Sequence, residues 1–170
     1  MLKYIANLTA LFAVFLHQRV INMKIPDLYT LVPSFSLPDL QGRRVSLWNY
    51  KHQQPVVLVV GDANSESLLR DFSYRYPDYG SEGAEVLVIL PQRPDGDDWP
   101  FPVLIDTDGR VSARLADRLP AILVLDSYNE LYARFEGPWP EGANHRDILE
   151  CIAQTELRCP ECGVAEWPYP

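Results

Sequence analysis

The chain has 170 residues, 47% hydrophobic and 22% charged, enough for one globular domain with a core of its own. Its net charge of −8, without a cluster of Lys and Arg, argues against nucleic acid as a partner, because phosphate binding needs clustered positive charge. The three cysteines all fall in the last twenty residues, which is not the disulfide framework of a small secreted scaffold. We therefore expect a cytoplasmic domain.

Residues 1–24 differ in composition from the rest of the chain. Lys3 precedes an apolar run over residues 4–16. The largest side chains of this run recur at helical spacing: Leu8, Leu11, Phe12, Phe15 and Leu16. The pattern predicts a helix that docks on its own domain or joins two copies of the chain. Attachment to a membrane surface through residues 1–22, or export, is the alternative, although the run is shorter than the roughly 20 residues of a membrane-spanning helix.

The first half of the remaining sequence predicts two strands and a helix. Residues 45–48 form a short strand after a turn at Gly42. The run over 56–60 is uninterrupted, apolar and mostly β-branched, which predicts a central strand covered on both faces. A helix is expected over 65–76, capped by Ser65 or Asn64 and broken between residues 80 and 83.

The second half continues this alternation of strands and helices. A buried strand is expected over 85–90, followed by a proline-rich loop that is longer than most connections. The elements expected after that loop are a strand over 101–106, a short helix over 110–119, a hairpin of 122–126 with 131–135, and a helix over 143–157. The order predicts an α/β fold with a mixed sheet and helices on both faces.

Four stretches, 35–42, 55–60, 101–109 and 119–126, together resemble the redoxin families, namely the AhpC/TSA peroxiredoxins and the TlpA/ResA group. The resemblance implies a thioredoxin-like fold for residues 33–157, with a cis proline at Pro120. It also implies that a reactive cysteine should open the helix after the strand at 56–60.

The loop after that strand contains no cysteine. On the family pattern, Ser65 stands near the first cysteine of a CxxC motif and Leu68 at the second. A helix N-terminus activates a thiol, whereas a serine needs an adjacent base, and no spacing brings His52 or His145 to Ser65. We therefore place the family's active-site region at Ser65 and Pro120, assign no catalytic residue there, and expect Ser65 to be a helix cap.

Residues 158–170 contain the motif Cys159-Pro-Glu-Cys162 and an aromatic, proline-rich end. The two cysteines are candidates for a redox dithiol or for half of a zinc site. Their position after a helix C-terminus, beside Glu161, disfavours a reactive thiolate. Zinc would need further ligands, from Cys151, His145 or a second chain. The spacing places Cys151 on the apolar face of the last helix, as a core thiol.

Three hypotheses follow. The favoured one is a degenerate redoxin, not an enzyme, that acts as a protein-binding or assembly module through its two terminal extensions. The second is a thiol–disulfide oxidoreductase or peroxidase that uses Cys159 and Cys162 and brings them close to Pro120. The third is an oligomer stabilised by zinc at the same two cysteines. The expected partner is a protein or a second copy of the chain. Zinc is the one cofactor that the sequence leaves possible.

Overall fold

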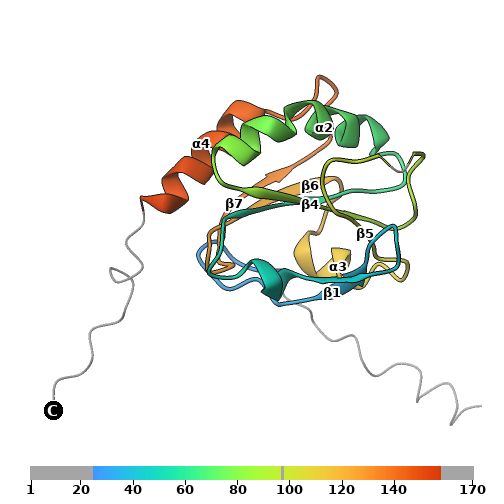
Figure 1. The fold of residues 1–170 in the computed structure, drawn as a ribbon, viewed down its shortest axis with the longest axis horizontal. Helices are drawn as coiled ribbons and strands as arrows, with labels where there is room; N and C mark the ends of the chain where they lie inside the picture. Colours follow the sequence, from blue (N-terminus) through green and yellow to red (C-terminus); the bar gives the residue numbers. More distant parts are fainter. Residues whose placement is uncertain (1–24, 97, 158–170) are drawn as a thin grey trace, which may run out of the picture.

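The computed structural model describes residues 25–96 and 98–157, and its centre is a five-stranded sheet in the order β5-β4-β3-β6-β7 (Figure 1). The pairs β3–β4 and β4–β5 are parallel, and the pairs β3–β6 and β6–β7 are antiparallel. The strands are β3 (Val56–Val60), β4 (Glu85–Leu90), β5 (Val103–Ile105), β6 (Ala121–Leu125) and β7 (Leu131–Glu136). This is the mixed sheet that the sequence predicts, and the fold is thioredoxin-like.

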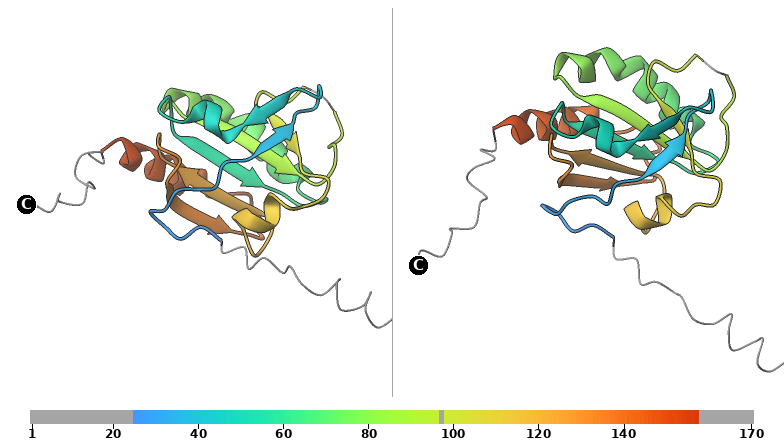
Figure 2. Two further views of the ribbon diagram at one scale, coloured as in Figure 1. Left: turned by 90° about the horizontal axis from the view of Figure 1, so that it is seen from below. Right: turned by 60° about the horizontal axis from the view of Figure 1, so that its bottom comes forward.

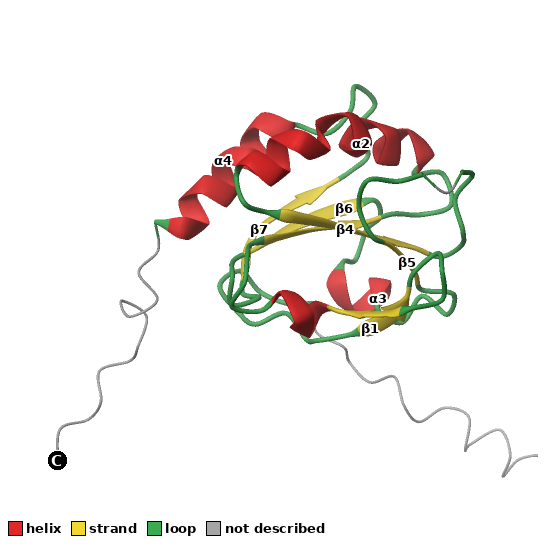
Figure 3. Ribbon diagram, in the orientation of Figure 1, coloured by secondary structure: helices red, strands yellow, loops and turns green. Residues whose placement is uncertain are grey.

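Both faces of the sheet are covered (Figures 2 and 3). The helices α2 (Glu66–Ser81) and α4 (His145–Glu156) lie on one face. The other face carries β1 (Ser36–Pro38), β2 (Arg44–Ser46), the 3-10 helix η1 (Leu47–Tyr50) and the short α3 (Ser112–Leu115). In the ranges that the structure describes, no helix is long and apolar enough to cross a membrane.

Strand β3 shows why the core has two halves. Its five residues are fully buried. Because side chains alternate along a strand, Val56, Leu58 and Val60 enter the core on the α3 side, while Val57 and Val59 enter the core under α2 and α4. The prediction of a central strand covered on both faces is therefore confirmed.

Helix α2 is longer than the sequence pattern indicates. It continues past Tyr76 through Pro77 and Gly80, because the fully buried Tyr79 ties its last turn to the core. It ends at Ser81, and the chain turns away at Gly83, whose φ of +69° allows Gly83 N–H to reach Gly80 O and Ala84 N–H to reach Tyr79 O. The helix thus ends within the predicted break between residues 80 and 83, although it continues past Tyr76.

Three smaller predictions also need correction. The expected strand over 45–48 ends at Ser46, because the chain turns into η1, where the Ser46 hydroxyl accepts a hydrogen bond from Trp48 N–H. The helix expected over 110–119 is confined to α3, since Ala116 is already extended. The strand expected from residue 101 forms only from Val103. The hairpin and the last helix form within two residues of their predicted bounds.

Several predictions lie outside the described residues. These are the helix within residues 1–24 and the Cys159/Cys162 motif with its aromatic tail.

Candidate functional site: a pocket at the N-terminus of α2

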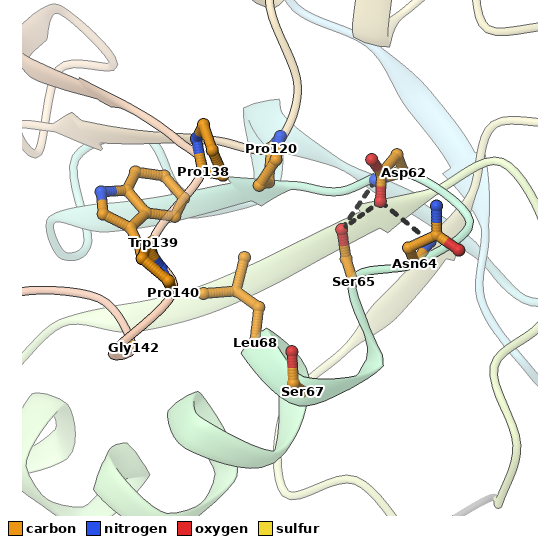
Figure 4. A pocket seen from close by; sticks show the side chains of 10 residues that line it. All are labelled: Asp62, Asn64, Ser65, Ser67, Leu68, Pro120, Pro138, Trp139, Pro140 and Gly142. Carbon is orange, nitrogen blue, oxygen red and sulfur yellow. Dashed lines mark hydrogen bonds between the residues drawn. The ribbon is translucent and has the colours of Figure 1, made fainter.

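A cavity of about 370 Å³ opens between the N-terminus of α2 and two loops that contain prolines (Figure 4). It brings together Ser65 and Pro120, the two positions that the resemblance marks as the active-site region. The lining residues are Asp62, Asn64, Ser65, Ser67, Leu68, Pro120, Pro138, Trp139, Pro140 and Gly142. One wall is therefore polar and comes from the loop after β3, while the opposite wall is apolar and rich in proline.

The polar wall depends on a close approach at Gly61. Gly61 N–H donates to Ile89 O on the neighbouring strand at 2.9 Å. A Cβ atom at this position would lie 2.6 Å from Leu90 Cδ2 and 2.8 Å from Ser65 Cβ. Only glycine allows the chain to leave β3 this tightly, and the turn places Ser65 at the start of α2.

Ser65 and Asp62 form a closed pair of hydrogen bonds. The Ser65 hydroxyl accepts from Asp62 N–H at 2.9 Å and donates to Asp62 Oδ1 at 2.8 Å. Asn64 N–H donates to the same oxygen at 2.9 Å. Ser65 occupies the N-cap position of α2, but its side chain makes no capping bond. The prediction of a side-chain cap at Ser65 or Asn64 is therefore wrong, because the Ser65 hydroxyl binds the loop before the helix.

This arrangement does not activate Ser65 as a nucleophile. Its side chain is only 4% exposed, and its proton is held by a carboxylate, which is too weak a base to remove it. The first cysteine of the sequence is Cys151, so the described lining of the cavity contains no thiol. The pocket can offer hydrogen bonds and apolar contact to a ligand.

The apolar wall contains two cis proline bonds. The bonds Leu119–Pro120 and Gly137–Pro138 are both cis, which confirms the expectation for Pro120. Gly137 N–H donates to Pro120 O at 2.8 Å. A Cβ atom at Gly137 would lie 2.9 Å from Pro120 Cγ and 3.1 Å from Trp139 Cε3, so the loop after β7 packs directly on Pro120.

Trp139 is the largest side chain of the cavity, and the sequence interpretation missed it. It lies beside Pro120 and Pro138 in Figure 4, across the cavity from Ser65, and it is half-buried. The signal that could have identified it is the run Gly137-Pro-Trp-Pro140 directly after the last strand, where prolines hold an aromatic ring close to a sheet edge.

The loop that holds Trp139 is fastened to α2 through Asp71. Ala143 N–H donates to Asp71 Oδ2 at 3.0 Å, and His145 Nε2 lies 2.9 Å from the same oxygen. The other ring nitrogen of His145 lies 2.7 Å from the Tyr79 hydroxyl. Burial, with the negative charges of Asp71 and Asp78, raises the pKa of Tyr79 far above its ordinary value, so this phenol stays protonated. His145 is thus buried beside Asp71 and Tyr79, and it does not line the cavity.

Neither histidine considered as a base lies in the pocket. His52 stacks edge-on against Tyr128, with ring centroids 5.0 Å apart, on the turn of the β6–β7 hairpin. Within the described ranges, no group of three His, Cys, Asp or Glu side chains is arranged to hold a metal ion.

Cys151 is half-buried on α4 and packs against the core beneath α2 and α4, so it is less enclosed than expected. Burial raises the pKa of its thiol, and the negative charges of Asp147 and Glu150 raise it further. Cys151 is therefore a poor nucleophile at neutral pH.

The model of the AhpC/TSA family matches residues 29–134 of this chain, whereas no curated protein sequence matches it. Among solved structures, the mitochondrial 2-Cys peroxiredoxin from Plasmodium falciparum aligns with a TM-score of 0.64 at 17% identity, covering 75% of this chain and 93% of its own. The reduced 2-Cys peroxiredoxin from Plasmodium vivax gives 0.67 at 14%, covering 82% and 88%. Peroxidoxin BcpB from Mycobacterium tuberculosis gives 0.64 at 17%, covering 79% and 99%. At these identities the structures establish the fold alone.

Proposed function

This chain belongs to the AhpC/TSA family, and we propose that it is a binding module whose pocket takes up a segment of a protein partner. The observation on which this proposal rests is the state of Ser65. A side chain with a hydroxyl in place of a thiol, closed onto Asp62 by two hydrogen bonds, supports structure and recognition but not attack on a peroxide.

The shape and chemistry of the cavity favour an extended, apolar peptide. Its volume of about 370 Å³ suits one or two side chains rather than a large cofactor. Trp139 and three prolines supply a rigid apolar surface, which is the type of surface that binds proline-rich segments. Asn64 and Ser67 are exposed at the polar wall and are available to hydrogen-bond the backbone of such a segment.

The position of α4 argues against an active site made from this pocket and the Cys159/Cys162 pair of the same chain. The Glu156 carboxylate lies 4.0 Å from the Cβ position of Gly83, beyond the C-terminal end of α2. Ser65 precedes the opposite end of this 16-residue helix, which is roughly 24 Å long. Cys159 follows Leu157 by two residues, which span at most about 7 Å, and Cys162 follows it by five residues, which span at most about 18 Å. This reach is shorter than α2, which supports a binding role for the pocket over a site that it shares with those two cysteines.

A second candidate function follows from the family itself. Cys159 and Cys162 would form an independent dithiol that reduces a peroxide, becoming a disulfide while the peroxide yields water. Membership of the AhpC/TSA family favours this thiol peroxidase or oxidoreductase. Zinc binding by the same pair is a further proposal, and native mass spectrometry of the zinc-loaded and chelator-treated chain tests it.

The binding proposal is tested by selecting peptides from a random display library on the immobilised full chain. Selected peptides are then measured against the wild type, Trp139→Ala and the control Trp48→Ala, which removes an exposed tryptophan outside the pocket. We expect apolar, proline-containing peptides whose affinity falls at least about tenfold with Trp139→Ala and is unchanged with Trp48→Ala.

Two results would count against this function. Selected peptides that bind Trp139→Ala as tightly as the wild type would place recognition elsewhere. Catalytic peroxide reduction that is lost in Cys159→Ser would favour the second candidate.

A further inference from the structure

The described lining of the cavity at the N-terminus of α2 contains one charged side chain, that of Asp62. The other lining residues are serine, asparagine, leucine, glycine, tryptophan and proline, all of them uncharged. A segment that enters this cavity therefore meets a single negative charge, on the polar wall.

Asp62 uses only one of its two carboxylate oxygens within the described structure. Oδ1 accepts from the Ser65 hydroxyl at 2.8 Å and from Asn64 N–H at 2.9 Å. Oδ2 makes no hydrogen bond or ion pair with a described residue, although Asp62 is half-buried. A carboxylate oxygen in this position is available to a cationic group of a ligand, which forms the stronger, charge-assisted type of hydrogen bond.

Charges on the side of α2 do not cancel the charge of Asp62. The N-terminus of a helix carries about half a positive charge, whereas the carboxylate carries a full negative one. The nearest basic residue of α2 is Arg70, which is bound to Glu66 across one turn, so this pair adds no net charge. The polar wall therefore has a net negative charge.

The other side of the cavity adds no excess of positive charge either. Arg118 stands two residues before Pro120 and is exposed next to the equally exposed Asp117. Glu141 is exposed in the loop of the apolar wall. The whole chain has 23 acidic and 15 basic side chains, so its long-range field also attracts a cationic partner.

The two walls together match a long basic side chain. Figure 4 shows Pro120 between Asp62 and Trp139, so the carboxylate and the indole ring lie on opposite sides of the cavity. Arginine and lysine have an apolar stem that packs on such a surface and a cationic end that needs a polar partner. An aromatic ring also attracts a nearby cation, and tryptophan does so most strongly.

On the basis of the binding function proposed above, we propose that the pocket selects partner segments in which an arginine or a lysine stands among prolines. The cationic end pairs with Asp62 Oδ2, and the stem packs on Trp139 and Pro120. Asp62 then determines specificity, whereas the apolar wall supplies contact that does not depend on charge.

The experiment titrates the isotope-labelled full chain with three capped heptapeptides and follows the titration by NMR. The peptides have a proline pair on each side of a central residue, which is arginine, glutamine or glutamate. We expect the arginine peptide to bind about fivefold more tightly than the glutamine peptide, and the glutamate peptide to bind most weakly, because a half-exposed ion pair contributes at this level. The signals of Asn64, Ser67 and the Trp139 indole should shift, since these residues line the cavity.

The decisive variant is Asp62→Asn, which removes the charge and keeps an oxygen that accepts from Ser65 and Asn64. In this variant the arginine and glutamine peptides should bind equally. The matched control is Asp108→Asn, which removes an exposed carboxylate outside the cavity and should keep the preference for arginine. Circular dichroism checks the fold of both variants. In the wild type, raising the salt from about 0.05 M to about 0.5 M should also reduce the preference, which tests the charge without a substitution.

Three results would overturn this specificity. Equal binding of the three peptides to the wild type would do so while leaving the binding function in place. A preference for arginine that persists in Asp62→Asn would assign the recognition of charge to another part of the chain. Binding of none of the peptides would count against the binding function itself, and the specificity would fall with it.

Discussion

Replacing Ser65 by alanine removes a hydroxyl that joins the loop after β3 to the start of α2. The hydroxyl accepts from Asp62 N–H and donates to Asp62 Oδ1, and the side chain is only 4% exposed. The variant therefore leaves the Asp62 amide without its partner in a partly buried loop. Asp62 Oδ1 keeps its hydrogen bond from Asn64 N–H.

The free energy of unfolding that Ser65→Ala loses can be estimated from these two hydrogen bonds. A neutral hydrogen bond contributes about 1 kcal/mol, and one to a charged group about 1.5–3 kcal/mol. Asp62 is half-buried, so water recovers part of the loss at its carboxylate. We expect Ser65→Ala to lower the free energy of unfolding by about 2 kcal/mol, which is about 4–8 °C in Tm for a chain of this size.

Urea unfolding followed by circular dichroism measures this difference. The matched control is Ser67→Ala, an exposed serine of the same cavity, which should stay within about 0.5 kcal/mol of the wild type. A Ser65→Ala variant as stable as the control would mean that the hydroxyl bonds to Asp62 make no net contribution to the stability of this loop.

Three further predictions concern the rest of the molecule. Gly61→Ala should lower the free energy of unfolding in urea by about 1–3 kcal/mol, because its Cβ would meet Leu90 and Ser65; an unchanged midpoint would contradict the close packing. Burial raises the pKa of Asp39, but hydrogen bonds from Arg43 and from a backbone N–H hold this pKa below its ordinary value. As the pH falls below about 4, the wild type should therefore lose stability that Asp39→Asn does not lose. Parallel curves of unfolding free energy against pH for the two proteins would count against this. At pH 7, iodoacetamide should modify Cys151 more slowly in the native chain than in the chain unfolded by urea. Peptide mass spectrometry measures the two rates. Equal rates would mean that burial and the neighbouring acidic residues do not protect the thiol.

The sequence predicted those parts of the fold that depend on local pattern. The uninterrupted apolar run of β3 requires burial on both faces of the sheet, and all five of its residues are buried in the structure. Helix α2 continues five residues past the expected Tyr76, because the burial of Tyr79 outweighs the low helix propensity of Pro77 and Gly80.

The pocket was predicted only in part, since its walls come from distant segments. Ser65 and Pro120 could be placed by resemblance to a family. Trp139 could not, because its position depends on the packing of Gly137 against Pro120 and on the attachment of the following loop to Asp71. The bond between Ser65 and Asp62 was also missed, because a serine before a helix is an ordinary cap by pattern and only the geometry of the loop redirects it.

One kinetic measurement tests the proposal that this AhpC/TSA member binds a partner and does not reduce peroxide. The fully reduced full chain is mixed with hydrogen peroxide in a stopped-flow instrument, with dithiothreitol as the electron donor. We expect the chain to consume peroxide no faster than free cysteine does at the same thiol concentration. Saturable turnover that disappears in Cys159→Ser would contradict it and would assign catalysis to the C-terminal dithiol.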